Sequence, residues 1–300
     1  MKKVIVISGP TASGKTSLSI ELARFFRGEI INADSVQIYK KFDIGSAKVT
    51  IEETQKVKHH LLSEIEPEDY YNIYNFQKDV RNLIPNIKLP FLVGGSGLYI
   101  KAALFDYELL PEDPFLHYRL NIENLTLEQM LEQIHEQDSE LIIDEKNSCR
   151  IISAYKQIMQ NSLRSQKKGK NTPLFDILFL YLDIPKDILK ERICTRLEYM
   201  LHKGFIEEVQ YLISNHSKAN FNIIGYREIK AFLENKINLI DAKKLIIQNS
   251  LKYAKRQKTW FKNQIYSLKI INPFEKHWKQ NTFKMVEKFL QDNGARYNND

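Results

Sequence analysis

A loop near the N-terminus carries the residues whose types and spacing most clearly indicate chemistry. The β-branched run Val4–Ile7 precedes eight residues that fit G-x-x-x-x-G-K-[ST]: Gly9, Pro10, Thr11, Ala12, Ser13, Gly14, Lys15 and Thr16. Between a strand and a helix, such a loop surrounds an anion with backbone N–H groups, and the helix N-terminus adds partial positive charge. Lys15 is expected to reach the terminal phosphates, and the Thr16 hydroxyl to bind Mg²⁺. The sequence therefore predicts a di- or triphosphate site, against the alternative of a chance match in an ordinary strand-to-helix turn.

Asp34 follows a second apolar run, Glu29–Ala33, which is typical of a short strand. In an open parallel sheet, ligands bind outside the carboxyl ends of the strands, so Asp34 is expected to face the space above the loop. A carboxylate there can accept a proton or help to hold Mg²⁺. Asp is also a preferred helix N-cap, and both interpretations stay open at this point.

Three further features are less specific. Lys48 is placed in a loop where it could meet an anion, although a plain surface lysine is the simpler interpretation. The adjacent His59 and His60 point to opposite sides of an extended segment, which favours structural roles over a metal site. The glycines of the segment Gly94–Gly97 permit either the close approach of a ligand or a tight turn, and composition alone favours the turn.

The elements that must position these residues alternate as in an α/β protein. Apolar runs predict strands, and amphipathic patterns predict helices. The strands are expected near residues 4–7, 29–33, 90–93, 177–182 and 268–271, and the core helices near 71–87, 186–215, 223–228 and 241–263. From Pro111 to about Lys170 the alternation stops, and helices are expected to begin near Thr126 and Arg150. We therefore expect a core of residues 1–112 and 174–300, with a parallel sheet flanked by helices, and an all-helical insertion of residues 113–173.

The charge distribution points to a polyanionic partner. The formal net charge is +7, and two blocks contain no acidic residue: residues 146–175 with seven Lys or Arg, and residues 242–274 with eight. Such blocks indicate contact with a nucleic acid backbone, or else solvated helix faces. In the second block, residues with the spacing of one helix face are Lys252, Lys255, Arg256, Thr259 and Lys262.

Composition excludes several other classes. The only two cysteines, Cys149 and Cys194, are far apart, which argues against a disulfide framework or a zinc site and suits a reducing compartment. No apolar run approaches the ~20 residues of a membrane span, and the opening strand is too short for a signal peptide. No heptad seam demands a partner. We expect a cytoplasmic monomer that is not bound to a membrane, with a frayed tail over residues 294–300.

Taken in chain order, the motifs resemble those of one family, the bacterial tRNA dimethylallyltransferases, also called tRNA isopentenyltransferases. The resemblance runs from residue 4 to about residue 262. The matching segments are Gly9–Thr16, Asp34-Ser35 with Gln37 and Tyr39, Gly45–Lys48, His59–Leu61, Val93–Tyr99, Gly204 with Glu207–Val209, Ile224–Glu228, and Ala254–Gln257 with Thr259-Trp260.

The resemblance implies a P-loop NTPase-like core that transfers a dimethylallyl group from dimethylallyl diphosphate to N6 of adenosine 37 in tRNA, with Mg²⁺. It implies that the loop Gly9–Thr16 binds the diphosphate, that Thr16 binds the metal, and that the catalytic residues are Asp34, Thr16, Lys15 and Arg227. Asp34 would take the proton of the amine, and Arg227 and Lys48 would add to the diphosphate clamp. The insertion and the basic helix would hold the anticodon stem-loop, largely by shape and backbone. The residues implied for tRNA binding are Asp34, Ser35, Val36, Gln37, Lys48, Ser96, Cys149, Arg150, Ile151, Ile152, Ser153, Lys255 and Arg256.

The sequence departs from the family pattern at three kinds of position. The family usually has Asn-Pro-Gln-Arg-Ile-Ile-Arg-Ala-Leu-Glu where this chain has residues 147–156, and Arg150 is retained while the preceding Gln and the following Arg are replaced by Cys149 and Ser153. Ser46 and Ser96 stand where the family has Thr, and both keep a hydroxyl. The C-terminal zinc finger of eukaryotic relatives has no counterpart.

Two rival functions use the same loop. A P-loop kinase of small molecules or nucleotides would bind ATP and a small acceptor, and it gives no reason for the two basic blocks. A non-catalytic RNA-binding NTPase would bind tRNA and hydrolyse nucleotide without prenyl transfer. Both account for fewer of the matching residues than the transferase does.

Overall fold

A computed structural model describes residues 1–111, 122–167 and 170–292. The chain forms two compact units: Phe105–Thr172 is one, and Met1–Leu104 together with the chain from Pro173 onward is the other. The boundary predicted at residues 112–113 and the tail 294–300 lie outside the described residues.

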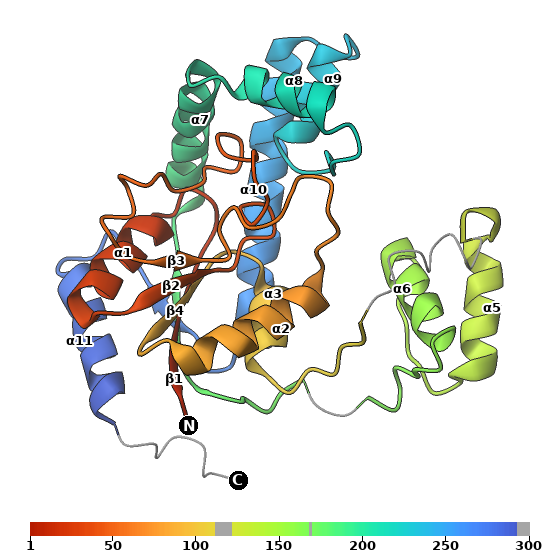
Figure 1. Cartoon of the computed structure of the whole chain (residues 1–300), viewed down its shortest axis with the longest axis horizontal. Helices are drawn as coiled ribbons and strands as arrows, with labels where there is room; N and C mark the ends of the chain where they lie inside the picture. The colour runs from red at the N-terminus through yellow and green to blue at the C-terminus, as the bar shows by residue number, and fades with distance from the viewer. Residues whose placement is uncertain (112–121, 168–169, 293–300) are drawn as a thin grey trace. The chain divides into compact units, whose positions relative to one another are not determined.

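The larger unit is built on a six-stranded, all-parallel sheet with the order β3-β2-β4-β1-β5-β6 (Figure 1). The strands are β1 Lys3–Ser8, β2 Glu29–Asn32, β3 His59–His60, β4 Pro90–Val93, β5 Asp176–Leu182 and β6 Lys269–Ile271. This confirms the predicted α/β class. Because β1 lies between β4 and β5, the phosphate loop leaves the middle of the sheet.

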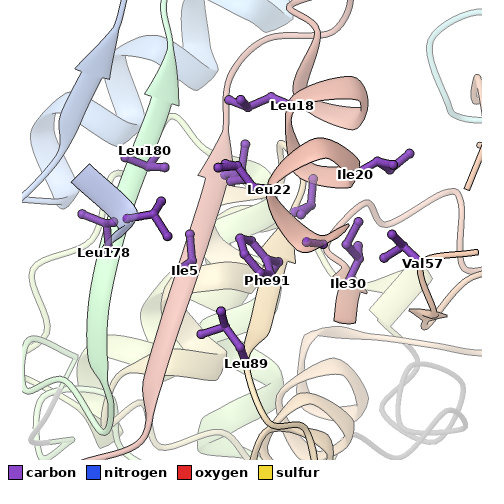
Figure 2. Packing of buried hydrophobic residues seen from close by; sticks show 14 of the residues in the cluster. Ile5, Leu18, Ile20, Leu22, Ile30, Val57, Leu89, Phe91, Leu178 and Leu180 are labelled. Atoms are coloured by element: carbon purple, nitrogen blue, oxygen red, sulfur yellow. The ribbon is translucent and has the colours of Figure 1, made fainter. Parts of the chain in front are cut away.

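One hydrophobic cluster fixes the position of that loop. Ile5 of β1 packs with Leu22 of helix α1 (Lys15–Phe26), Phe91 of β4 and Leu180 of β5 (Figure 2). Ile7 of β1 belongs to the same cluster, and all five side chains are nearly inaccessible to solvent. Full burial of each such side chain contributes about 1.5–3 kcal/mol to folding. The strand before the loop and the helix after it are therefore held against one common core.

Helices cover the sheet and extend beyond it. In the larger unit they are α1 Lys15–Phe26, α2 Ile73–Leu83, α3 Gly97–Leu104, α7 Lys186–His202, α8 Phe205–Asn215, α9 Tyr226–Leu233, α10 Leu239–Gln264 and α11 Trp278–Gln291. Figure 1 shows α1 and α11 beside each other, where Phe25 and Phe283 meet edge to face. No helix among the described residues is long and apolar enough to cross a membrane.

The structure gives the bounds of two predicted helical regions. The helix expected over 71–87 begins after Asn72, whose side chain forms a capping box with Asn75, and ends at Leu83. Pro85 has no backbone N–H and lies in the 3₁₀ turn η1, Ile84–Asn86. The region 186–215 forms two helices, since Gly204 adopts a left-handed conformation with φ +99° between them.

Three helices or strands of the described residues escaped prediction. α3 begins at Gly97, in the glycine segment for which composition favoured a turn. β3 is only two residues long and consists of His59 and His60, so it carries no apolar pattern. α11 packs Val286 and Phe289 against the core. The Lys3 ammonium donates to the carbonyls of Phe289 and Leu290 at the end of this helix, at 2.8 and 2.9 Å.

The smaller unit has a core of its own. It contains α5 Leu127–Gln137, α6 Ser148–Ile158 and the 3₁₀ turn η2 Ile122–Asn124. The capping box expected at Thr126 is present, with Gln129 as its partner. Met130 and Ile134 of α5 pack against Ile151 and Tyr155 of α6.

Candidate active site

The phosphate loop has the conformation and the free donor that an anion requires. Gly9 and Gly14 have φ +151° and +93°, and a Cβ at Gly9 would lie only 2.8 Å from the Leu182 carbonyl oxygen. The Ser13 hydroxyl is buried and has no hydrogen-bond partner among the described residues. A buried hydroxyl without a partner costs about 1–3 kcal/mol. A phosphate oxygen in the loop would remove that cost.

Lys15 lies inside this loop. Its ammonium donates to the carbonyls of Gly9 and Pro10, at 2.9 and 2.7 Å. Burial, and after it the positive charge of Arg196, lower the pKa of Lys15 to about 8, against the opposing effect of the Asp34 carboxylate. The loop therefore holds a lysine whose charge an incoming anion would stabilise.

Two arginines of α7 complete the wall above the loop. Arg196 donates to the Thr11 hydroxyl at 3.2 Å, and Arg192 donates to the Ala12 carbonyl at 3.4 Å. Burial also lowers the pKa of Arg196, whose guanidinium nevertheless stays charged because arginine ionises far above neutral pH. Sequence reasoning gave these residues no role. One signal in the sequence could have found them. Arg192 and Arg196 are four residues apart, so they share a face of the helix that follows a buried strand.

The loop and these arginines line a cleft of about 1090 Å³. Asp34, Gln37, Gly94, Gly95 and Gln257 also line it. Gln37 donates from Nε2 to the carbonyls of Ser46 and Ala47, at 3.0 and 3.3 Å, and so closes the loop beside the cleft.

Asp34 is not a helix N-cap, because residues 35–38 form a turn and no helix begins there, but its carboxylate holds that turn. Its Oδ1 accepts hydrogen bonds from the backbone N–H of Val36 at 2.9 Å and of Gln37 at 3.4 Å. No donor among the described residues reaches Oδ2, and the carboxylate lines the cleft. These hydrogen bonds hold the carboxylate in place and leave one oxygen for chemistry.

A second cavity, of about 1260 Å³, adjoins the first. Thr11, Asp34, Ser46, Arg196 and Tyr253 line both. The two cavities therefore meet at Asp34, and most of the phosphate loop lines the first of them.

The walls of the second cavity are mixed in character. Exposed residues of α10 give it a basic edge: Lys252, Lys255, Arg256 and Thr259. Ser35, Val36, Ser96 and Trp260 line it as well. The helix face predicted from the spacing of basic residues thus borders a cavity, with the exception of Lys262, which does not line it.

Arg227 lies at this second cavity and not among the residues that line the phosphate-loop cleft. Its guanidinium donates to Glu228 at 2.7 Å and to the side chain of Asn222 at 3.0 Å. The role expected for Arg227 in a diphosphate clamp stays a prediction.

Lys48 is held by acceptors of the protein itself. Its ammonium is nearly buried and donates to the Tyr39 carbonyl at 2.6 Å, the Asp43 carboxylate at 2.6 Å and the Ser63 hydroxyl at 2.8 Å. It lines neither cavity. An ammonium with three acceptors is engaged in holding its own loop, and the role expected for Lys48 toward diphosphate or RNA stays a prediction.

Other residues of the matching motifs also hold loops. The Glu208 carboxylate accepts from the backbone N–H of Asp43, Ile44 and Gly45 at 2.6–3.0 Å, and from the Tyr226 hydroxyl at 2.7 Å. This carboxylate fixes the segment that delivers Gly45 and Ser46 to the second cavity.

The histidines have structural partners. His60 lies 2.6 Å from the Glu29 carboxylate, and His59 contacts the Val57 carbonyl at 2.9 Å. Within the described ranges, no three His, Cys, Asp or Glu side chains form a cluster that could hold a metal alone.

In the smaller unit, the residues expected to bind tRNA divide by exposure. Cys149, Arg150 and Ser153 are exposed on α6, and Ile152 is half-buried. Ile151 is fully buried in the core of the unit. Its side chain belongs to that core, and the contact with tRNA expected for this residue stays a prediction.

With this geometry in view, comparison with known proteins assigns the class. The chain belongs to the IPP transferase family, whose model matches residues 37–264, and an isopentenyl transferase model matches residues 2–67. The resemblance drawn from the motifs is confirmed.

The individual relatives agree with one another. A tRNA dimethylallyltransferase of Aster yellows witches'-broom phytoplasma is 54% identical, covering 97% of this chain and 99% of the relative. That of Acholeplasma laidlawii is 48% identical with the same coverage. Among solved structures, a tRNA delta(2)-isopentenylpyrophosphate transferase of Staphylococcus epidermidis is 33% identical, with a TM-score of 0.72 over 97% of this chain and 99% of that one. A eukaryotic dimethylallyltransferase acting on tRNA is 25% identical, with a TM-score of 0.81 over 97% and 80%.

Proposed function

We propose that this chain transfers a dimethylallyl group from dimethylallyl diphosphate to N6 of adenosine 37 in tRNA, beside the anticodon. The observation that carries the proposal is the junction of two cavities at Asp34. One has the walls of a diphosphate site, and the other has a basic edge open to a polyanion.

The donor diphosphate suits the first cleft. Backbone N–H groups of the loop, the Ser13 hydroxyl, Lys15 and Arg196 offer hydrogen bonds and positive charge to its oxygens. These groups would stabilise the charge that develops as the C–O bond of the donor breaks.

Mg²⁺ fits the same place. The exposed Thr16 hydroxyl lines the cleft, with the Asp34 carboxylate in the same wall. Because Mg²⁺ is usually held by few protein oxygens together with substrate phosphates and water, such a donor set is sufficient. When bound, the ion neutralises charge on the departing diphosphate.

The acceptor base enters from the second cavity. An adenosine must leave its stack to reach a buried site, which costs a few kcal/mol that contacts in the pocket offset. The edge formed by Lys252, Lys255 and Arg256 would meet the RNA backbone, whose phosphates dominate affinity. In the smaller unit, exposed Cys149, Arg150 and Ser153 would contact the anticodon stem-loop, which makes residues 113–173 a tRNA-binding insertion.

Asp34 performs the proton transfer. The N6 nitrogen attacks the first carbon of the prenyl chain, the C–O bond breaks with its electron pair leaving on diphosphate, and one N6 proton passes to Asp34. We also propose that the protein acts as a monomer in the cytoplasm.

A P-loop kinase is the alternative. It would place ATP in the loop and a small acceptor in the second cavity. The exposed lysines and arginine along that cavity favour an RNA acceptor, because a small acceptor has no use for an extended basic edge.

The test is incubation with Mg²⁺, dimethylallyl diphosphate and an anticodon stem-loop with adenosine at positions 36 and 37, followed by nucleoside mass spectrometry. We expect one added isopentenyl group at position 37. Unmodified RNA together with ATP hydrolysis would favour the kinase or NTPase.

A further inference from the structure

A buried amide beside the phosphate loop has an acceptor that no protein group uses. Gln257 of α10 is only 8% exposed and lines the same cleft as Asp34. Its Nε2 donates to the Gly95 carbonyl at 2.9 Å. Its Oε1 is buried and has no hydrogen-bond partner among the described residues.

The orientation of this amide follows from its one hydrogen bond. A carbonyl oxygen such as that of Gly95 can only accept, so the amide must present its nitrogen there and its oxygen elsewhere. The contact is close: a Cβ at position 95 would lie 2.2 Å from Gln257 Nε2. Gly95 therefore permits the amide to be held in one orientation.

The unused oxygen excludes one substrate and points to the other. A diphosphate presents oxygens, which cannot donate to Oε1 at neutral pH. The exocyclic amine of adenine presents two N–H donors. Asp34, Tyr253 and Gln257 line the same cleft, and Asp34 and Tyr253 also line the second cavity, from which the base would enter.

We infer that Gln257 is a positioning and specificity residue, whose Oε1 accepts one N6–H of the target adenine while Asp34 accepts the other. This inference rests on the proposed function. The hydrogen on the Asp34 side is the one lost as the N–C bond forms and diphosphate departs. The hydrogen on the Gln257 side stays on nitrogen in the product.

A pair of acceptors also explains base selection. Guanine and hypoxanthine carry an oxygen at position 6, so they would place a third acceptor against Asp34 and Gln257. A site built to accept hydrogen bonds rejects an analogue that cannot donate them far more strongly than it rejects a difference in size.

The test compares binding of two stem-loops that differ by one amino group: adenosine or purine riboside at position 37. We expect wild-type protein to bind the adenosine form about tenfold more tightly, as one or two good hydrogen bonds imply. Gln257→Met should reduce this ratio at least threefold while affinity for the purine form stays within about twofold. Gln257→Glu keeps an acceptor and loses the donor to Gly95, and it should retain most of the discrimination.

For each protein, both stem-loops are titrated against the same preparation. A fraction of unfolded protein therefore affects both titrations equally and leaves the ratio of the two affinities unchanged. Equal weakening of both stem-loops by Gln257→Met, or loss of discrimination in Gln257→Glu, would show a merely structural amide. A wild-type ratio near one would indicate that Oε1 binds water only, and would also overturn the inference. Prenyl transfer is measured in parallel: discrimination without transfer contradicts the proposed function alone, and transfer without discrimination contradicts this inference alone.

Discussion

The two cavities that meet at Asp34 are built in different ways. The phosphate loop is one continuous segment between β1 and α1, and its anion site consists largely of its own backbone, Ser13 and Lys15. The second cavity is assembled from side chains of loops and of α7 and α10, which lie far apart in the sequence. A site made of consecutive residues is specified locally, whereas an assembled site exists only once the fold is complete. Substitutions at the junction, in the loop and in the supporting contacts should therefore have graded effects.

The largest effect is expected at the junction. Asp34→Ala should lower prenyl transfer by about 10²–10⁴-fold, because it removes the group proposed to take the proton, while tRNA binding stays nearly intact. Asp34→Asn is the matched control, since an amide oxygen can still accept from the Val36 N–H but cannot take a proton. We expect the two variants to be equally inactive in single-turnover transfer, with Asn the more stable of the two. Equal loss of binding and transfer would contradict the role assigned to Asp34.

Arg196 should come next. Arg196→Leu removes a charge that lines both cavities and donates to Thr11, and we expect a loss of about 10²-fold in kcat/KM, comparable to removal of one charge-stabilising donor. Lys190→Leu removes the same charge from an exposed position of α7 that lines neither cavity, and should change kcat/KM less than twofold. Similar losses in both variants would mean that net charge, and not position, matters.

The loop should show a pH dependence. The pKa of Lys15 is about 8, and a bound anion raises it again. Below pH 8 the Lys15 side chain is already a charged ammonium. Above pH 8 it is mostly neutral, so it must take up a proton when diphosphate binds. Affinity for inorganic diphosphate should therefore fall as pH rises past 8, by up to about tenfold per pH unit. Calorimetric titrations from pH 7 to 9.5 check this. Lys15→Met cannot titrate, so its weaker binding should lose this component of the pH dependence, and an unchanged profile would contradict it.

The smallest effect is expected at a supporting contact. Glu208→Gln weakens charge-assisted bonds to the backbone of Asp43–Gly45, which should lower the free energy of unfolding by about 1–3 kcal/mol and transfer only a few-fold. Glu207→Gln, in the same helical turn but exposed, should leave both within error. Urea unfolding and amide exchange of residues 43–45 measure the difference. Faster exchange in neither variant would show that Glu208 does not hold this segment.

The order of strands illustrates what patterns can predict. Apolar runs located five of the six strands. In β1, β2, β4 and β5 nearly every residue is buried, so the apolar run is continuous, whereas β6 buries only Ile271. β3 was missed because it comprises two histidines, which join the sheet by pairing with Ile30 and Ile31 of β2. The break after Leu83 depends on a single proline, which the periodic pattern obscured.

The features of the candidate site can be separated in the same way, into those predicted from local sequence and those seen only in the folded chain. Local sequence was enough to predict the phosphate loop, the place of Asp34 at the end of a strand and the basic face of α10, since each depends on residues close together in the chain. The folded chain was needed to see that Lys48 is engaged by its own loop, that Ile151 is buried, and that Arg196 and Gln257 lie beside the phosphate loop. The physical reason is that burial and hydrogen-bond partners are set by segments distant in sequence, and one residue's type does not reveal which segment will pack against it.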